Sequence, residues 1–118
     1  MMRTGTLPEQ GDIVLIPVPF TDLTAQKRRP VIVVSNRRYH RRTPDTIVVA
    51  MASNPAPVPY SFVLTADDLM HGQLDRPGTV RVARIYTLAQ ALAMRVFEYV
   101  DRATLDHIGE NLRELITR

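Results

Sequence analysis

A short basic run, Lys27-Arg28-Arg29, lies directly before Pro30 and an apolar stretch. Its side chains are the strongest candidates in the sequence for binding an anion or taking part in catalysis. An arginine stays charged at physiological pH, and its planar fork can hold two phosphate oxygens at once. For the same reason it is poorly suited to donating or accepting a proton. The proline biases Arg29 toward an extended backbone, which would hold it at the start of a strand. The run therefore predicts an anion site centred on Arg29, where the side chain stabilises negative charge.

The charge around this run is one-sided. The chain has 15 Lys and Arg against 12 Asp and Glu, a formal net charge of +3. The segment from Leu23 to Pro44 nevertheless holds seven basic residues and no acidic one, a pattern that attracts polyanions. A solvated basic loop is the alternative explanation, and we prefer it for Arg41 and Arg42. We expect RNA contacts from five basic residues: Lys27, Arg28, Arg37, Arg38 and Arg84.

The three histidines are the candidates for acid–base chemistry, but none has the spacing of a metal site or a partner in sequence. His40 lies in the basic segment and could contact RNA. His71 precedes Gly72, where stabilisation of a helix end explains it, and His107 lies among acids near the C-terminus. The chain also has no cysteine. We therefore expect no metal, no cofactor and no catalytic histidine pair.

Length and composition indicate one globular domain. The chain has 118 residues, of which 45% are hydrophobic and 23% charged. Residues 1–10 lack periodicity and predict a flexible tail, so the domain is expected over 11–118. The apolar runs are too short to span a membrane, and the lack of cysteine suits a reducing compartment. We expect a cytoplasmic protein.

The elements that must position the basic residues are mostly strands. Runs rich in β-branched residues predict strands at 12–18, 30–35, 46–52, 60–64, 79–88 and 94–100. We expect loops at 19–29 and 36–45, and Thr65 with Asp68 predicts the start of a short helix. Asp101 should cap a final helix with apolar residues at helical spacing, in which Gly109 would mark close packing. The order favours a mainly β protein, a small curved barrel with short helices.

The stretch from Gly11 to Asn36 resembles the opening of the MazF/PemK toxin family, in particular its PemK-like branch. The shared order is Gly-Asp-Ile, then Pro-Phe-Thr-Asp in the first loop, then Lys-x-Arg-Pro before an apolar strand that ends in serine. A weaker resemblance continues into the final helix. In this chain the motifs are Gly11-Asp12-Ile13, Pro19-Phe20-Thr21-Asp22, Lys27-Arg28-Arg29-Pro30 and Val31 to Ser35.

The resemblance implies an SH3-like barrel that forms homodimers, cuts single-stranded RNA without a metal, and is neutralised by a cognate antitoxin. It also implies that the arginine before the proline, here Arg29, is catalytic. A threonine at the end of the third strand usually assists, but this chain has Ala52 there, with Ser53 beside it. Ser53 is the candidate for this role, which requires a bulge or a strand end because neighbouring strand residues point to opposite faces. The alternative is that Ser53 is only a polar residue at a strand end next to a turn.

Two further positions depart from the family pattern. Pro77-Gly78 stands where Pro-Ser is frequent, and Ala83 stands where an acid commonly precedes the basic residue, here Arg84. Two alternative functions therefore stay open: a catalytically weakened RNA- or partner-binding module of the same fold, and a CcdB-like gyrase inhibitor. The basic segments favour RNA over gyrase. For base stacking, Tyr39 and Tyr60 are the candidates, with core packing as their alternative role.

Overall fold

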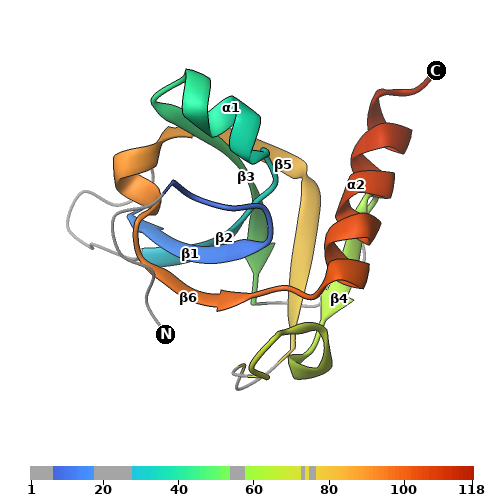
Figure 1. Ribbon diagram of the computed structural model, residues 1–118. Helices are drawn as coiled ribbons and strands as arrows, with labels where there is room; N and C mark the ends of the chain where they lie inside the picture. The colour runs from blue at the N-terminus through green and yellow to red at the C-terminus, as the bar shows by residue number, and fades with distance from the viewer. Residues whose placement is uncertain (1–6, 18–27, 54–57, 73, 75–76) are drawn as a thin grey trace.

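The computed structural model describes residues 7–17, 28–53, 58–72, 74 and 77–118. Within this part of the chain, six strands form one antiparallel sheet in the order β4-β5-β3-β2-β1-β6, which curls into half a barrel (Figure 1). The mainly β prediction is thereby confirmed. The strands are β1 (Asp12–Pro17), β2 (Arg28–Val33), β3 (Asp45–Ala52), β4 (Ser61–Leu64), β5 (Gly78–Ala89) and β6 (Val96–Tyr99).

The central strands bury side chains on both faces of the sheet, which explains their continuous apolar runs. Ile13 pairs with Ile32, which pairs with Val49, and these residues belong to one core. Their neighbours Val14 and Val31 point the opposite way and belong to a second core. All five are at most 3% exposed, and burying each contributes about 1.5–3 kcal/mol.

Strand β5 carries a large irregularity. Val49 of β3 pairs with Ile85, whereas the next residue, Ala50, pairs with Arg81, so residues 82–84 have no counterpart. Inserted residues bend a strand and increase its twist. The first part of β5 pairs with β4, and the second part continues along β3 alone, which helps to curl the sheet (Figure 1).

The final helix α2 (Arg102–Ile116) confirms the predicted one. The Asp101 carboxylate accepts the backbone N–H of Thr104 at 2.8 Å and caps the helix. Ile108 is fully buried in the first core, and Leu105 and Leu112 pack against it. No described helix is both long and apolar enough to cross a membrane.

Gly109 of α2 does not mark close packing, so that expectation is wrong. It is exposed, and a Cβ atom placed there would have no neighbour within 4 Å. We therefore expect Gly109→Ala to stabilise the protein by about 0.5–1 kcal/mol, because alanine is the better helix former. Urea unfolding would measure this gain. A loss of stability would show that the helix meets a neighbour at this position.

The segment predicted as a basic loop at 36–45 contains a helix instead, α1 (Arg37–Arg42). The Asn36 side chain accepts the backbone N–H of Tyr39 at 2.9 Å and caps the first turn. The Gln90 amide donates to three carbonyl oxygens at the end of the helix and just beyond it, at 2.8–2.9 Å. Six residues form a marginal helix alone, so these long-range bonds stabilise it.

The remaining short elements follow the prediction in part. Thr65 begins the 3₁₀ helix η1 (Ala66–Asp68), and its N–H donates to the Asp68 carboxylate at 2.8 Å, as expected. A second 3₁₀ turn, η2 (Gln90–Ala93), was not predicted, and the last strand is shorter than the predicted 94–100.

Residues 7–10, assigned to a flexible tail by the sequence, contact the domain. Pro8 is buried, and the Glu9 N–H donates to the Asp12 carboxylate at 2.9 Å. Glu9 also forms an ion pair with Arg37 of α1. Residues 1–6 of the predicted tail lie outside the described residues.

Candidate functional site

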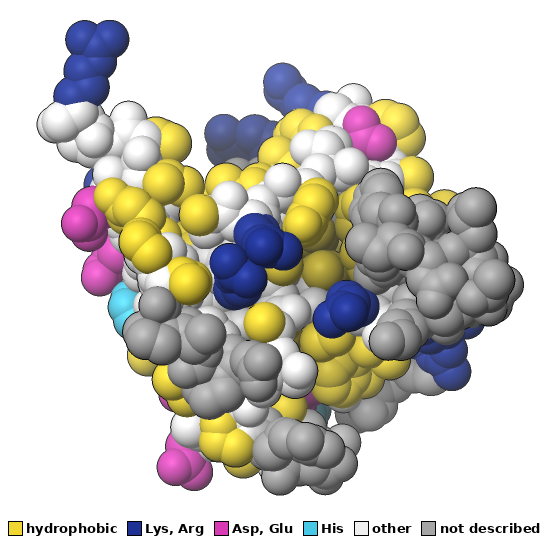
Figure 2. Space-filling view, turned by 180° about the vertical axis from the view of Figure 1, so that it is seen from behind, with side chains coloured by type: hydrophobic (Ala, Val, Ile, Leu, Met, Phe, Trp, Pro, Cys, Tyr) yellow, Lys and Arg dark blue, Asp and Glu magenta, His cyan; other side chains and the backbone are white. Residues whose placement is uncertain are grey.

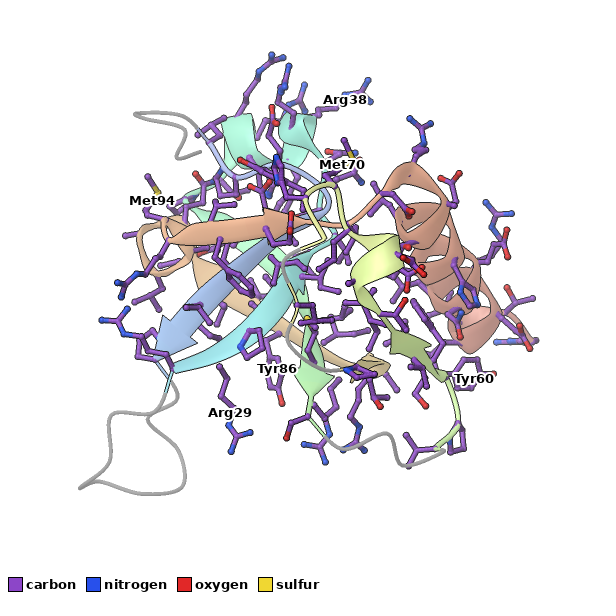
Figure 3. All side chains as sticks on the ribbon, turned by 90° about the horizontal axis from the view of Figure 1, so that it is seen from below. Arg29, Arg38, Tyr60, Met70, Tyr86 and Met94 are labelled. Atoms are coloured by element: carbon purple, nitrogen blue, oxygen red, sulfur yellow. The ribbon has the colours of Figure 1, made fainter. Side chains whose placement is uncertain are left out.

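Arg28 and Arg29 are the first two residues of β2, and both are exposed at the open end of the sheet. Figure 3 shows the Arg29 side chain extending away from this end. The last residues of β3 and the first residue of β5 lie beside it, because antiparallel strands bring these ends together. They enclose a cleft of about 590 Å³. The cleft is lined by Arg28, Arg29, Pro30, Met51, Ala52, Ser53, Leu74, Pro77 and Gly78.

The strand register shows which side chains can act together with Arg29. Val31 pairs with Ala50, and continuing that register by two residues sets Ala52 opposite Arg29. Ala52 in turn pairs with Thr79. Paired residues on neighbouring strands point to the same side, so these side chains share one face, called the Arg29 face below. A threonine at position 52 would thus direct its hydroxyl toward the side of the sheet that carries Arg29.

Ser53 lies in a bend directly after β3 and lines the same cleft as Arg29. The register would place it opposite Arg28, on the other face of the sheet. Because it follows the last strand residue, however, strand alternation does not fix its direction. The structure therefore brings Ser53 to the cleft, and its catalytic role stays a prediction.

Gly78 lies where β5 approaches β3 closely at the cleft. A Cβ atom on Gly78 would lie 3.2 Å from the Ala52 carbonyl oxygen and 3.8 Å from the Met51 Cε atom. A serine here would press on the Ala52 carbonyl. The glycine that departs from the family pattern is thus explained by packing between β3 and β5.

Arg37 and Arg38, which were predicted to bind RNA, do not lie near Arg29. They belong to α1, which follows the far end of β2, and four strand residues alone span about 13 Å. Figure 3 shows Arg38 and Arg29 on opposite sides of the molecule. Arg84 is exposed within the irregular part of β5. Lys27 lies outside the described residues.

The two tyrosines considered for base stacking are also remote from Arg29. Tyr39 lies on α1, where its ring contacts His40 edge-on. Tyr60 packs against the first core, and Figure 3 shows it far from Arg29. Tyr60 therefore has the core-packing role that was its alternative, whereas Tyr39 is half-buried on α1 outside both cores.

His40 is buried and does not contact an open surface. Its Nε2 atom lies 2.6 Å from the Ser35 hydroxyl and 2.9 Å from the Thr46 hydroxyl. Burial lowers the pKa of His40, and the Pro8 carbonyl and the Asp12 charge oppose this shift. The side chain is therefore a neutral structural group, and the expectation of an RNA contact from it is wrong.

The other two histidines have separate neighbours. The His71 Nδ1 atom lies 3.0 Å from the buried Glu98 carboxylate, and His107 stacks on Phe62 with ring centres 4.1 Å apart. No three metal-ligating side chains cluster among the described residues. Among the described residues that line the cleft, Arg28 and Arg29 carry positive charge and Ser53 carries a hydroxyl group.

Sequence reasoning missed one cation. Arg81 of β5 pairs with Ala50 and so lies on the Arg29 face. The alternation of Val80 and Val82 around Arg81 was the available signal, because it separates the arginine from the core. Figure 2 shows Lys and Arg side chains among hydrophobic surface near the middle of one face of the molecule, with Asp and Glu toward its edges.

The curled antiparallel sheet, the closing helix and the cleft with two arginines at the open end of the sheet define a class of small, barrel-like β proteins. The chain belongs to the PemK-like, MazF-like toxin family of type II toxin–antitoxin systems, whose sequence model matches residues 9–116. The resemblance drawn from the Lys-Arg-Arg-Pro run is confirmed.

Solved structures of such toxins share the fold. An endoribonuclease from a mycobacterial species, in complex with its cognate antitoxin, is similar at 20% identity and a TM-score of 0.73, over 91% of this chain and 92% of that one. MazF from Deinococcus radiodurans is similar at 19% identity and a TM-score of 0.73, over 95% and 98% of the two chains. A MazE–MazF complex from the same organism gives 20% identity and a TM-score of 0.75, over 94% and 97%. A comparison with curated protein sequences gave no match.

Proposed function

We propose that this toxin is a metal-independent endoribonuclease that cleaves single-stranded RNA, with Arg29 as its central catalytic residue. The observation that carries the proposal is the position of Arg29, exposed at a cleft formed by the ends of three strands. The family match and the endoribonucleases of the same fold support the same activity. These comparisons give no support to the gyrase-inhibitor alternative.

The reaction is an attack of a ribose 2′-oxygen on its neighbouring phosphorus. A bond forms between the 2′-oxygen and phosphorus, and the bond from phosphorus to the 5′-oxygen breaks. The 2′-hydroxyl loses a proton, and the leaving 5′-oxygen gains one. Negative charge builds on the phosphate oxygens in between, and a bidentate guanidinium stabilises it. The products are a 2′,3′-cyclic phosphate and a 5′-hydroxyl.

Incubation with a long single-stranded RNA in the presence of a chelator tests this function. We expect discrete fragments that carry 2′,3′-cyclic phosphate ends. Intact RNA that is retained in a gel shift would overturn the nuclease and favour the binding-module alternative. Fragments that appear only when a divalent metal is added would contradict the metal-independent mechanism.

The missing threonine gives a second test of the site. We expect Ala52→Thr to raise the cleavage rate by roughly tenfold, because its hydroxyl would donate to a phosphate oxygen on the Arg29 face. The rate would be measured with a single RNA substrate at saturation. Ala89→Thr is the matched control, since Ala89 is an exposed alanine of β5 that pairs with Asp45, at the other end of the sheet. Equal cleavage rates for Ala52→Thr and Ala89→Thr would show that the side chain at position 52 is not part of the catalytic site.

The partners follow from the same proposal. We propose a homodimer and a cognate antitoxin with an acidic segment, since a basic surface would attract both the RNA and its inhibitor. Exposed Leu92, Met94 and Phe97, at 47%, 51% and 38%, provide apolar surface for association. We propose a cytoplasmic location because the substrate is cellular RNA. Light scattering of the purified protein would test the dimer.

A further inference from the structure

A strip of small side chains crosses the Arg29 face beside Arg29. Strand β3 lies between β2 and β5, and its outward residues near the cleft are Ala50 and Ala52. Both are only half-buried, although the sheet on either side carries large residues. The two alanines therefore form a shallow floor between the neighbouring strands.

Two side chains of β5 border this floor on the side away from Arg29. Arg81 pairs with Ala50, and Tyr86 pairs with Val48 two residues further along β3. In a regular strand, residues 81 and 86 would point to opposite faces, because five is an odd separation. The three unpaired residues 82–84 change this alternation and place both side chains on the Arg29 face.

The chemistry of the strip suits one strand of nucleic acid. Arg29 and Arg81 lie on strands that are two positions apart in the sheet, a separation of about 10 Å across the strands. Arg81 is half-buried and forms no hydrogen bond or ion pair with the described residues. Tyr86 is 38% exposed, so its ring is accessible. Cations along a groove and an aromatic ring are the usual platform for single-stranded RNA.

We propose that Arg81 binds a phosphate next to the scissile one and that Tyr86 stacks on a base, so that this strip positions the RNA for Arg29. The inference rests on the proposed function, because it names further residues of the same RNA site. Arg81 and Tyr86 act in binding, and neither takes part in the bond changes at phosphorus.

The test measures binding without cleavage. The probe is a fluorescein-labelled pool of single-stranded 2′-O-methyl RNA, which has no free 2′-hydroxyl to attack, and anisotropy is recorded from 50 to 200 mM salt. We expect Arg81→Gln to weaken binding roughly fivefold and to lower the salt slope by about 0.7, the value for one phosphate contact on a single strand. Arg81→Lys keeps the charge and should keep the slope.

Arg41→Gln is the matched control, because it removes the same charge from α1 at the other end of the sheet. It should bind as the wild type does. If Arg41→Gln and Arg81→Gln weaken RNA binding equally, the loss of affinity comes from the lower net charge of the protein, and the inference is overturned. Wild-type binding by Arg81→Gln, or no binding of the probe by the wild type, would overturn it as well.

Tyr86→Phe should preserve binding, whereas Tyr86→Leu should weaken it, because only an aromatic ring stacks on a base. A changed molecular mass of Tyr86→Leu with unchanged RNA affinity would assign this face to self-association instead. The cleavage assay separates this inference from the proposed function. If RNA binding depends on Arg81 but natural RNA is not cleaved, only the proposed nuclease activity is overturned. If natural RNA is cleaved and Arg81→Gln leaves KM unchanged, only the inference about Arg81 is overturned.

Discussion

Replacing Arg29 by alanine is expected to lower the rate of RNA cleavage at least about 100-fold, the usual cost of losing a charge-stabilising donor. The physical reason is the charge that builds on the phosphate oxygens, for which the described part of the cleft offers only arginine side chains as full positive charges. The loss should fall mainly on kcat, since the interaction strengthens as that charge develops. Single-turnover cleavage of one RNA substrate would measure it.

The neighbouring arginine provides the matched control. Arg28 belongs to the same exposed strand start, but strand alternation directs it to the other face. We expect Arg28→Ala to raise KM and to change kcat by less than about tenfold. The reason is that Arg28 would bind the substrate and the transition state equally well, so its loss weakens binding without slowing the chemical step. Arg29→Lys keeps the positive charge but lacks the planar guanidinium that can bind two phosphate oxygens. It should therefore recover part of the rate lost in Arg29→Ala. Wild-type cleavage by Arg29→Ala would remove this residue from the mechanism.

Acidification is expected to destabilise the fold through His40. Burial lowers the pKa of His40 in the folded chain, whereas in the unfolded chain it stays near 6.5. As the pH falls below 6.5, His40 takes up a proton in the unfolded chain but stays neutral in the folded chain. The free energy of unfolding therefore decreases, by at most about 1.4 kcal/mol per pH unit for one group. The stability that a neutral His40 provides is complete above pH 6.5.

Urea unfolding of the wild type and His40→Gln at pH 7.5, 6.5 and 5.5 would test this expectation. Glutamine can still bond to Ser35 and Thr46 but does not titrate, so the variant should lose less stability over this range. At pH 7.5 it should be less stable by about 1–3 kcal/mol, since its fit to the buried site is poorer. His107→Gln is the control because His107 is exposed. Identical pH slopes for wild type and His40→Gln would refute the role of His40.

The predicted elements succeeded where the signal was local. Continuous β-branched runs identified the strands, because residues that fill both faces of a sheet leave that pattern in sequence. Asp101 and the apolar spacing after it identified α2 for the same reason. Helix α1 was missed because its residues are basic and lack an apolar periodicity. Its stability comes from the Gln90 amide, which is about 50 residues away.

The sequence by itself indicated the family and predicted an anion site at Arg29, because a basic run before a proline and a strand is a local pattern. It also identified Ala52, Gly78 and Ala83 as departures from the family pattern. Only the tertiary structure decided which side chains lie beside Arg29. Strand pairing set Ala52 opposite it and separated Arg37 and Arg38 from it.

Residues 82–84 of β5, which have no partner in β3, had the largest effect on which side chains share a face with Arg29. They bring Arg81 and Tyr86 to the face that carries Arg29, although their spacing in sequence predicts opposite faces. An inserted residue in a strand changes the face of every later side chain, and its place is set by pairing with a distant partner. The chemistry expected of Arg29 could thus be read from residue types, whereas the side chains that share its face are set by strand register.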